Sequence, residues 1–164
     1  MIEHLSNPEY LHVLLNPLPV YGLAMGVLGL VIALLSRARA ARVTALAIVF
    51  VSTFAAWPVY HYGEAAYDRV LSMADNDGSK WLEEHQRRGE QLIYVFYAVA
   101  ALAALGLWAE RYAPRTAVPL ALATVVLATV TLGAGGYIAT AGGRIRHREF
   151  RYVPPPEQIK EHEA

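Results

Sequence analysis

Four continuous apolar runs constrain the fold of this chain more than any other feature of its sequence. They cover residues 11–35, 43–60, 91–109 and 116–141, and none contains Asp, Glu, Lys or Arg. Each is close to the roughly 18–25 residues that a helix needs to cross about 30 Å of hydrocarbon. Because the runs are continuous rather than alternating, they predict helices and exclude the strands of a membrane barrel.

We therefore expect an all-α fold, a bundle of four transmembrane helices that forms a single membrane domain over residues 1–164. The expected helices cover about 19–35, 43–73, 80–110 and 116–141, and a polar tail follows at 144–164. Residues 75–79, Asp-Asn-Asp-Gly-Ser, are the strongest turn signal, and Ser79 is expected to cap the third helix. Helices 2 and 3 would then form an antiparallel helical hairpin that projects beyond the bilayer.

Proline and glycine are expected to shape the first and last helices. Pro17 and Pro19 each bias the preceding residue away from helix, which predicts an irregular start to the first helix. Small residues at helical spacing predict a close helix contact there: Gly22, Gly26 and Gly29. The pair Gly142-Gly143 is expected to end the fourth helix.

Composition removes several classes of function. The chain has no cysteine, which excludes disulfides, iron–sulfur clusters and a covalently attached c-type haem. Its formal net charge is zero, so nucleic acid is not expected as a partner. Residues 1–10 carry no Lys or Arg, and no small-residue cleavage site follows, so we expect the first span to be retained.

Four crossings would place both termini and the hairpin on one side of the membrane. Arg37, Arg39 and Arg42 in the first short loop predict that the short loops are cytoplasmic. The protein would then lie in a bacterial inner membrane with both termini in the periplasm. Arginines of segment 144–151 argue for the reverse orientation.

All six histidines fall on the same predicted side: His4, His12, His61, His85, His147 and His162. The first and last lie in the tails, which leaves one histidine associated with each helix. Counting from the hairpin tip at 1.5 Å per residue, His61 and His85 differ in height by roughly 10 Å. His61 and Glu64 therefore form the core of the predicted site, and His85 with Asp68 forms a separate pair.

Three interpretations of this polar cluster stay open. A haem b would take His61 with His147 or His12 as axial ligands, and Arg144 and Arg146 would bind its propionates. A non-haem transition metal would use His61 and Glu64 plus one or two further ligands, with His12, His85 and His147 as candidates. In the third interpretation there is no cofactor, and the cluster is a buried ion-pair network.

Each candidate also has an ordinary structural interpretation. His12 and His61 are typical of residues at the membrane interface. The charged run 83–88 is typical of a solvated helix face. His147 lies in a basic stretch that suits anionic lipid headgroups.

Three short segments carry a resemblance to a family. They are 11–19 (Leu-His-Val-Leu-Leu-Asn-Pro-Leu-Pro), 61–65 (His-Tyr-Gly-Glu-Ala) and 142–149 (Gly-Gly-Arg-Ile-Arg-His-Arg-Glu). The chain resembles a group of uncharacterised bacterial four-helix membrane proteins, some ending in Gly-Gly-x-Ile-Arg-His-x-Glu. It departs from their commoner His-Phe-Pro opening by Pro17-Leu18-Pro19, which removes one histidine. The resemblance implies the four-helix topology and no established activity.

The leading hypothesis is a membrane protein that holds haem b or a His/carboxylate metal near the periplasmic face. It would transfer electrons between membrane quinol and another redox subunit. The alternative is an accessory subunit of a larger respiratory or photosynthetic complex, without its own cofactor. A transporter or channel is a weaker hypothesis, because no charged residue lies in the middle of any span.

Overall fold

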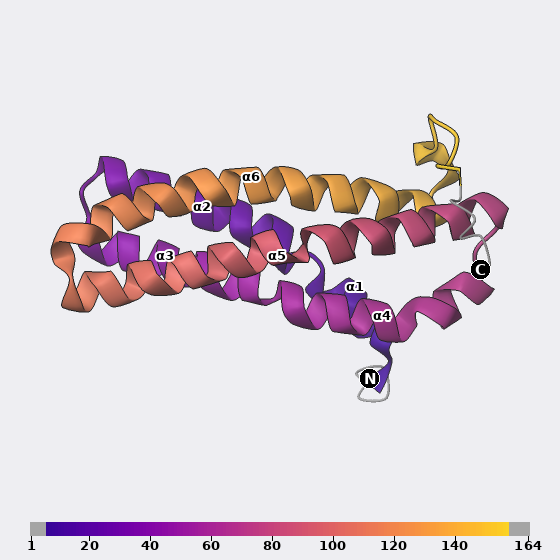
Figure 1. Cartoon of the computed structure of the whole chain (residues 1–164), viewed down its shortest axis with the longest axis horizontal. Helices are drawn as coiled ribbons and strands as arrows, with labels where there is room; N and C mark the ends of the chain where they lie inside the picture. The colour runs from indigo at the N-terminus through magenta and orange to yellow at the C-terminus, as the bar shows by residue number, and fades with distance from the viewer. Residues whose placement is uncertain (1–5, 158–164) are drawn as a thin grey trace, which may run out of the picture.

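The computed structural model describes residues 6–157, and these residues form an all-α four-helix bundle with no strand (Figure 1). Each of the four membrane-length units is long and apolar enough to cross a bilayer: Pro8–Leu35, Arg39–Ser72, Asn76–Tyr112 and Pro114–Arg146. The predicted fold class is therefore confirmed. His4 and His162 lie outside the described residues.

The first unit is interrupted, as its prolines predict. It consists of α1 (Pro8–Leu15), a turn, the wider π-helical segment η2 (Leu18–Gly22) and α2 (Leu23–Leu35). Helical structure thus begins at Pro8, well before the expected start at Pro19. Pro8 and Pro19 each lie near the first position of their helical segment. A proline is tolerated there, since the missing N–H would have no intrahelical partner.

The second unit is also divided, into α3 (Arg39–Phe54) and α4 (Ala56–Ser72). Ala55 separates them, three residues before Pro58. A proline inside a helix has no N–H to donate and its ring clashes with the carbonyl four residues earlier, here that of Phe54. The division changes the direction of α4 relative to α3. α4 packs mainly against α1 and less extensively against α5 (Figure 1).

The third and fourth units are single long helices, α5 (Asn76–Tyr112) and α6 (Pro114–Arg146). The prediction that Ser79 caps α5 is wrong, because the Asp75 carboxylate accepts a 2.7 Å hydrogen bond from the Gly78 N–H and α5 begins at Asn76. The prediction that Gly142-Gly143 ends the fourth helix is also wrong. α6 continues through both glycines because the helix there packs against α5, and packing overrides a weak local propensity.

The bundle interior is packed and its outer surface is apolar. Fully buried side chains of α2, α3, α5 and α6 form the core: Leu23, Leu30, Leu46, Val49, Val99, Ala121 and Ala128. Large apolar side chains point outward, among them Leu35 with 81% and Val126 with 67% of their surface exposed. Such a surface is expected where lipid, not water, surrounds a helix bundle.

α4 and α5 form the predicted hairpin, joined by the short connection 73–75 at the end of the bundle where the described chain also finishes (Figure 1). Beyond α6, the short 3-10 turn η3 (Arg148–Phe150) contacts this hairpin tip through an ion pair between Arg148 and Asp75. The hairpin and α1 together enclose the region that contains the candidate site.

Candidate functional site

His12 binds the backbone of α4 through one ring nitrogen. Its Nδ1 lies 2.8 Å from the carbonyl oxygen of Val59. The ring rests on Gly63, four residues further along the same helix, where a Cβ would lie only 2.9 Å from Nδ1. A carbonyl oxygen in a helix points toward the residue four positions later. An imidazole can therefore reach this oxygen only because residue 63 has no side chain.

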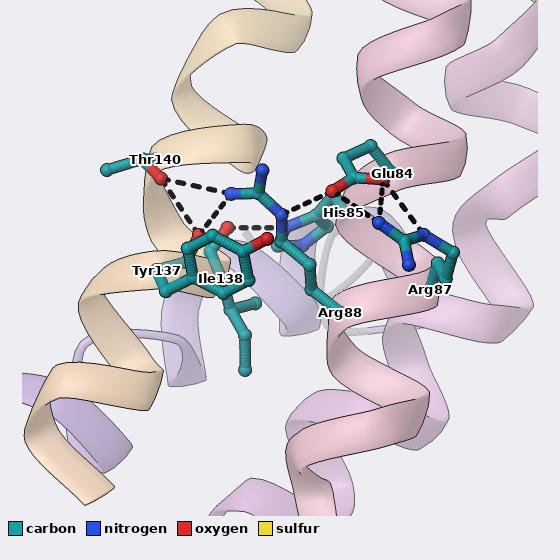
Figure 2. A network of polar contacts seen from close by, with 7 residues as sticks. All are labelled: Glu84, His85, Arg87, Arg88, Tyr137, Ile138 and Thr140. Atoms are coloured by element: carbon teal, nitrogen blue, oxygen red, sulfur yellow. Dashed lines mark hydrogen bonds and ion pairs between the residues drawn. The ribbon is translucent and has the colours of Figure 1, made fainter. Parts of the chain in front are cut away.

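His85 makes the same contact between the other two helices. Its Nδ1 lies 3.0 Å from the carbonyl oxygen of Ile138 on α6 (Figure 2). Its ring rests on Gly142, again four residues further along, where a Cβ would lie 3.0 Å from Cε1. The two histidines thus use one local geometry twice, on α4 and on α6.

These hydrogen bonds determine which nitrogen carries the proton on each ring. A backbone carbonyl only accepts, so Nδ1 must donate in both cases. In the tautomer that donates from Nδ1, the Nε2 atom of each imidazole carries no proton and has a free lone pair. The ring centroids of His12 and His85 are 6.2 Å apart, with their planes at 86°. The site therefore contains two fixed imidazoles that can each accept a hydrogen bond or coordinate a metal.

A cavity of about 800 Å³ surrounds the histidine pair between α1, α4, α5 and α6. Most of its lining is apolar, including Val20, Ile93 and Phe96. Its polar lining includes Asn16, Glu64, Gln86 and Arg146. Such a lining suits a largely apolar ligand oriented by a few polar groups.

A buried ion-pair network lies beside His85 on α5 (Figure 2). Glu84, with only 6% of its side chain exposed, binds Arg88 at 2.7 Å and the more exposed Arg87 at 2.6 Å. Arg88 donates to the Tyr137 carbonyl oxygen at 2.7 Å, and its guanidinium lies 3.7 Å from the centre of the Tyr137 ring. The prediction of a solvated face for residues 83–88 is therefore wrong for Glu84 and Arg88, which are buried against α6.

Arg88 and His85 contact consecutive carbonyls of α6, those of Tyr137 and Ile138. Both groups already lie on one face of α5, three residues apart. The network therefore fixes how α5 and α6 are aligned, and with it the position of the His85 ring.

The structure places His61 outside the cavity of the histidine pair, and Glu64 in its lining. His61 is exposed and stacks on Trp57, with ring centroids 6.1 Å apart and planes at 8°. Glu64 lines the cavity and accepts a 2.8 Å hydrogen bond from the Tyr60 hydroxyl. Asp68 is exposed.

His147 lies at the hairpin tip, beyond the end of α6. Its Nδ1 is 2.9 Å from a Glu149 carboxylate oxygen, and its ring stacks on Phe150 at 4.9 Å. The predicted pairing of His61 with His147 is not among the contacts of residues 6–157. Within that range no group of three or more His, Asp or Glu side chains is close enough to hold a metal ion.

Arg144 and Arg146 bind parts of the hairpin tip. The Arg144 guanidinium lies 4.5 Å from the centre of the Trp81 ring, and its Nε donates to the Phe150 carbonyl oxygen at 3.2 Å. Arg146 donates to the Met73 carbonyl oxygen at 3.3 Å and also lines the cavity. Of the two, only Arg146 is positioned to meet a ligand in this cavity.

Sequence reasoning identified both histidines of the pair but not their partnership. Level counting along a straight hairpin placed His85 beside Asp68, and it did not include α1, whose packing on α4 brings His12 into the bundle. Gly142, which lies below the His85 ring, was expected to end the fourth helix. One signal was available, because Gly63 and Gly142 each lie inside a segment that is otherwise expected to be helical, where a glycine can mark a close packing contact.

No protein family, curated protein or solved structure shows a significant match to this chain. The resemblance suggested by the three short segments therefore remains a prediction.

Proposed function

We propose that this is a multi-pass membrane protein that binds haem b between His12 and His85 and transfers electrons within the membrane. The observation that carries the proposal is the pair of imidazoles, each held by an Nδ1–H···O=C bond, with centroids 6.2 Å apart. This hydrogen bond is the usual way in which a protein orients a histidine that coordinates a metal through Nε2.

The two rings lie close enough together, with centroids 6.2 Å apart, for His12 and His85 to be the protein ligands of one group bound between them. Haem needs only two axial ligands from the protein, because its macrocycle supplies the other four nitrogens. A non-haem metal normally takes three or four protein ligands, and residues 6–157 offer no such group. The donor set therefore favours haem.

The surroundings of the pair also support a haem. The cavity of about 800 Å³ has a mainly apolar lining, which suits the face of a macrocycle. Arg146 in this lining is the candidate partner for a propionate group. Membrane quinol is the electron donor that we propose, and the orientation with the histidine end in the periplasm of a bacterial inner membrane belongs to the same proposal.

Visible spectroscopy of the purified protein tests the assignment. We expect a Soret band and the reduced-minus-oxidised bands of a low-spin haem with two histidine ligands, together with about one iron per chain. His12→Ala and His85→Ala should each convert this spectrum to a high-spin form or abolish it. The matched controls His61→Ala and His147→Ala should leave the spectrum unchanged, because both rings are exposed and lie outside the cavity lining.

The outcome also separates this proposal from its alternatives. If His61→Ala and His147→Ala abolish the spectrum while His12→Ala does not, the site proposed here is wrong. Absence of both a Soret band and stoichiometric metal would reject any redox cofactor. In that case, co-migration with a larger complex in native gels of the source membranes would support the accessory-subunit alternative.

A further inference from the structure

The end of the bundle opposite the hairpin tip is strongly basic. Here α2 ends, α3 begins, and α5 connects to α6 (the left end in Figure 1). The segments at this end carry five arginines and a single carboxylate, that of Glu110: Arg37, Arg39, Arg42, Arg111 and Arg115.

Glu110 forms ion pairs within the fold. Only 3% of its side chain is exposed, and it binds Arg42 and, at 3.3 Å, Arg39, both on α3. Among residues 6–157, no ion pair with a carboxylate joins the exposed side chains of Arg37, Arg111 or Arg115. The basic end therefore carries positive charge that the carboxylates of residues 6–157 do not neutralise.

Arg37 occupies a backbone position that favours glycine. Its φ is 54°, and it is the only residue other than glycine with positive φ in the described chain. The Arg37 N–H donates to the Leu34 carbonyl oxygen at 3.2 Å, and the Ala38 N–H donates to that of Ala33 at 3.1 Å. This is the Schellman ending of a helix, in which glycine is usual because other side chains are strained there. An arginine in this position suggests that its side chain has a role that offsets the strain.

Aromatic side chains place this end at the level of a membrane interface. Trp108 and Tyr112 expose 55% and 67% of their surface, and their rings lie 5.8 Å apart. The Arg111 guanidinium lies 5.3 Å from the centre of the Tyr112 ring. Exposed tryptophan and tyrosine beside arginine are typical of the headgroup region of a bilayer.

We propose that the basic end binds the headgroups of anionic phospholipids, with Arg37 and Arg115 as principal contacts. The exposed guanidinium groups supply charge and hydrogen-bond donors that match a phosphodiester. The neighbouring apolar and aromatic surface accommodates the acyl chains. This role is independent of any cofactor at the opposite end.

Lipid binding to the full chain in mild detergent tests the proposal. Energy transfer from tryptophan to pyrene-labelled lipid would report affinity for phosphatidylglycerol and, separately, for phosphatidylcholine. We expect tighter binding of phosphatidylglycerol, weakened roughly fivefold by Arg37→Gly and by Arg115→Gln, in keeping with the worth of one basic residue near an anionic surface. Arg69→Gln, which removes an exposed arginine at the opposite end, should change the affinity little.

Thermal unfolding of Arg37→Gly supplies the second measurement. Glycine relieves the strain at positive φ, so this variant should be at least as stable as the wild type while it binds phosphatidylglycerol less tightly. Lower stability would show that Arg37 serves the fold, and would overturn its proposed role. Equal affinity for the two lipids, or complete displacement of phosphatidylglycerol by millimolar inorganic phosphate, would overturn the proposal of a lipid site.

Discussion

His12 and His85 lie on different helices, yet each hydrogen-bonds a helix carbonyl and rests on the glycine four residues beyond it. The carbonyls are those of Val59 on α4 and Ile138 on α6. In both cases the glycine is what lets the ring approach, because a Cβ would lie about 3 Å from it. The relationship makes two glycines part of the site, although neither has a side chain.

Alanine at these two glycines should therefore displace the rings. A Cβ at position 63 would lie 2.9 Å from His12 Nδ1, and one at position 142 would lie 3.0 Å from His85 Cε1. We expect Gly63→Ala and Gly142→Ala to lower the free energy of unfolding by about 1–3 kcal/mol through overpacking. Both should also weaken haem retention, measured as the Soret absorbance per chain after gel filtration.

Gly136→Ala is the matched control, because nothing lies within 4 Å of a Cβ at that position on α6. It should raise the free energy of unfolding by about 0.5–1 kcal/mol, since alanine favours helix over glycine. If all three alanine variants change the free energy of unfolding by the same amount, the positions of the two rings do not depend on the absence of a side chain at Gly63 and Gly142.

The network beside His85 predicts unequal effects for its charged members. Glu84→Gln leaves Arg88, which is 9% exposed, without its counter-charge, and should lower the free energy of unfolding by about 3–5 kcal/mol. Arg87→Gln removes a side chain that is 50% exposed, and should cost less than about 1 kcal/mol. Denaturant unfolding of the two variants in the same detergent compares them. Comparable losses would mean that Glu84 is not the central member of the network.

The sequence predicted the helices well because their cause is local. A run of about twenty apolar residues has few stable alternatives to a membrane-length helix. The interruption at Pro17 and Pro19 likewise follows from the chemistry of proline. By the same rule Pro58 could have predicted the division between α3 and α4, and the expected continuous helix over 43–73 overlooked it.

The composition of the site could not be predicted in this way, because it depends on which helices pack together. Whether Glu84 faces water or α6 is not encoded in its own run of charges. Whether Gly142 ends a helix or receives a ring depends on His85, 57 positions earlier in the sequence. His12 contacts the bundle because α1 packs on α4, whose direction differs from that of α3. Each of these facts arises from tertiary contacts.

The small-residue face of the first unit was predicted, and the structure allows its members to be ranked. A Cβ on Gly26 would lie 2.8 Å from a Val49 methyl and 3.1 Å from the Val49 backbone nitrogen, whereas one on Gly29 would lie 3.5 Å from the Ala45 Cβ. Gly26→Ala should therefore destabilise the protein by about 1–3 kcal/mol, because the backbone of α3 cannot easily move aside. Gly29→Ala should be neutral or stabilising. Thermal unfolding of both variants measures the difference, and a reversed order would contradict the packing of α2 on α3.

At the hairpin tip, Asp75 binds Arg148 at 2.9 Å and Arg151 at 3.0 Å. Hydrogen bonds from Arg151 and the Gly78 N–H, with the charges of both arginines, lower the pKa of Asp75 from 3.8 to about 2. A carboxyl whose pKa is lower in the folded state stabilises the fold above its unfolded pKa, and this contribution disappears as the pH falls through the folded value. The stability difference between wild type and Asp75→Asn should therefore be constant above about pH 5, shrink between about pH 4 and 2, and vanish below.

Unfolding temperatures of the two proteins across this range measure the difference. Glu149 also has a lowered pKa, but it is present in both proteins and so should cancel. A difference that persists unchanged below pH 2, or grows on acidification, would show that the charge of Asp75 does not hold the C-terminal segment against the tip.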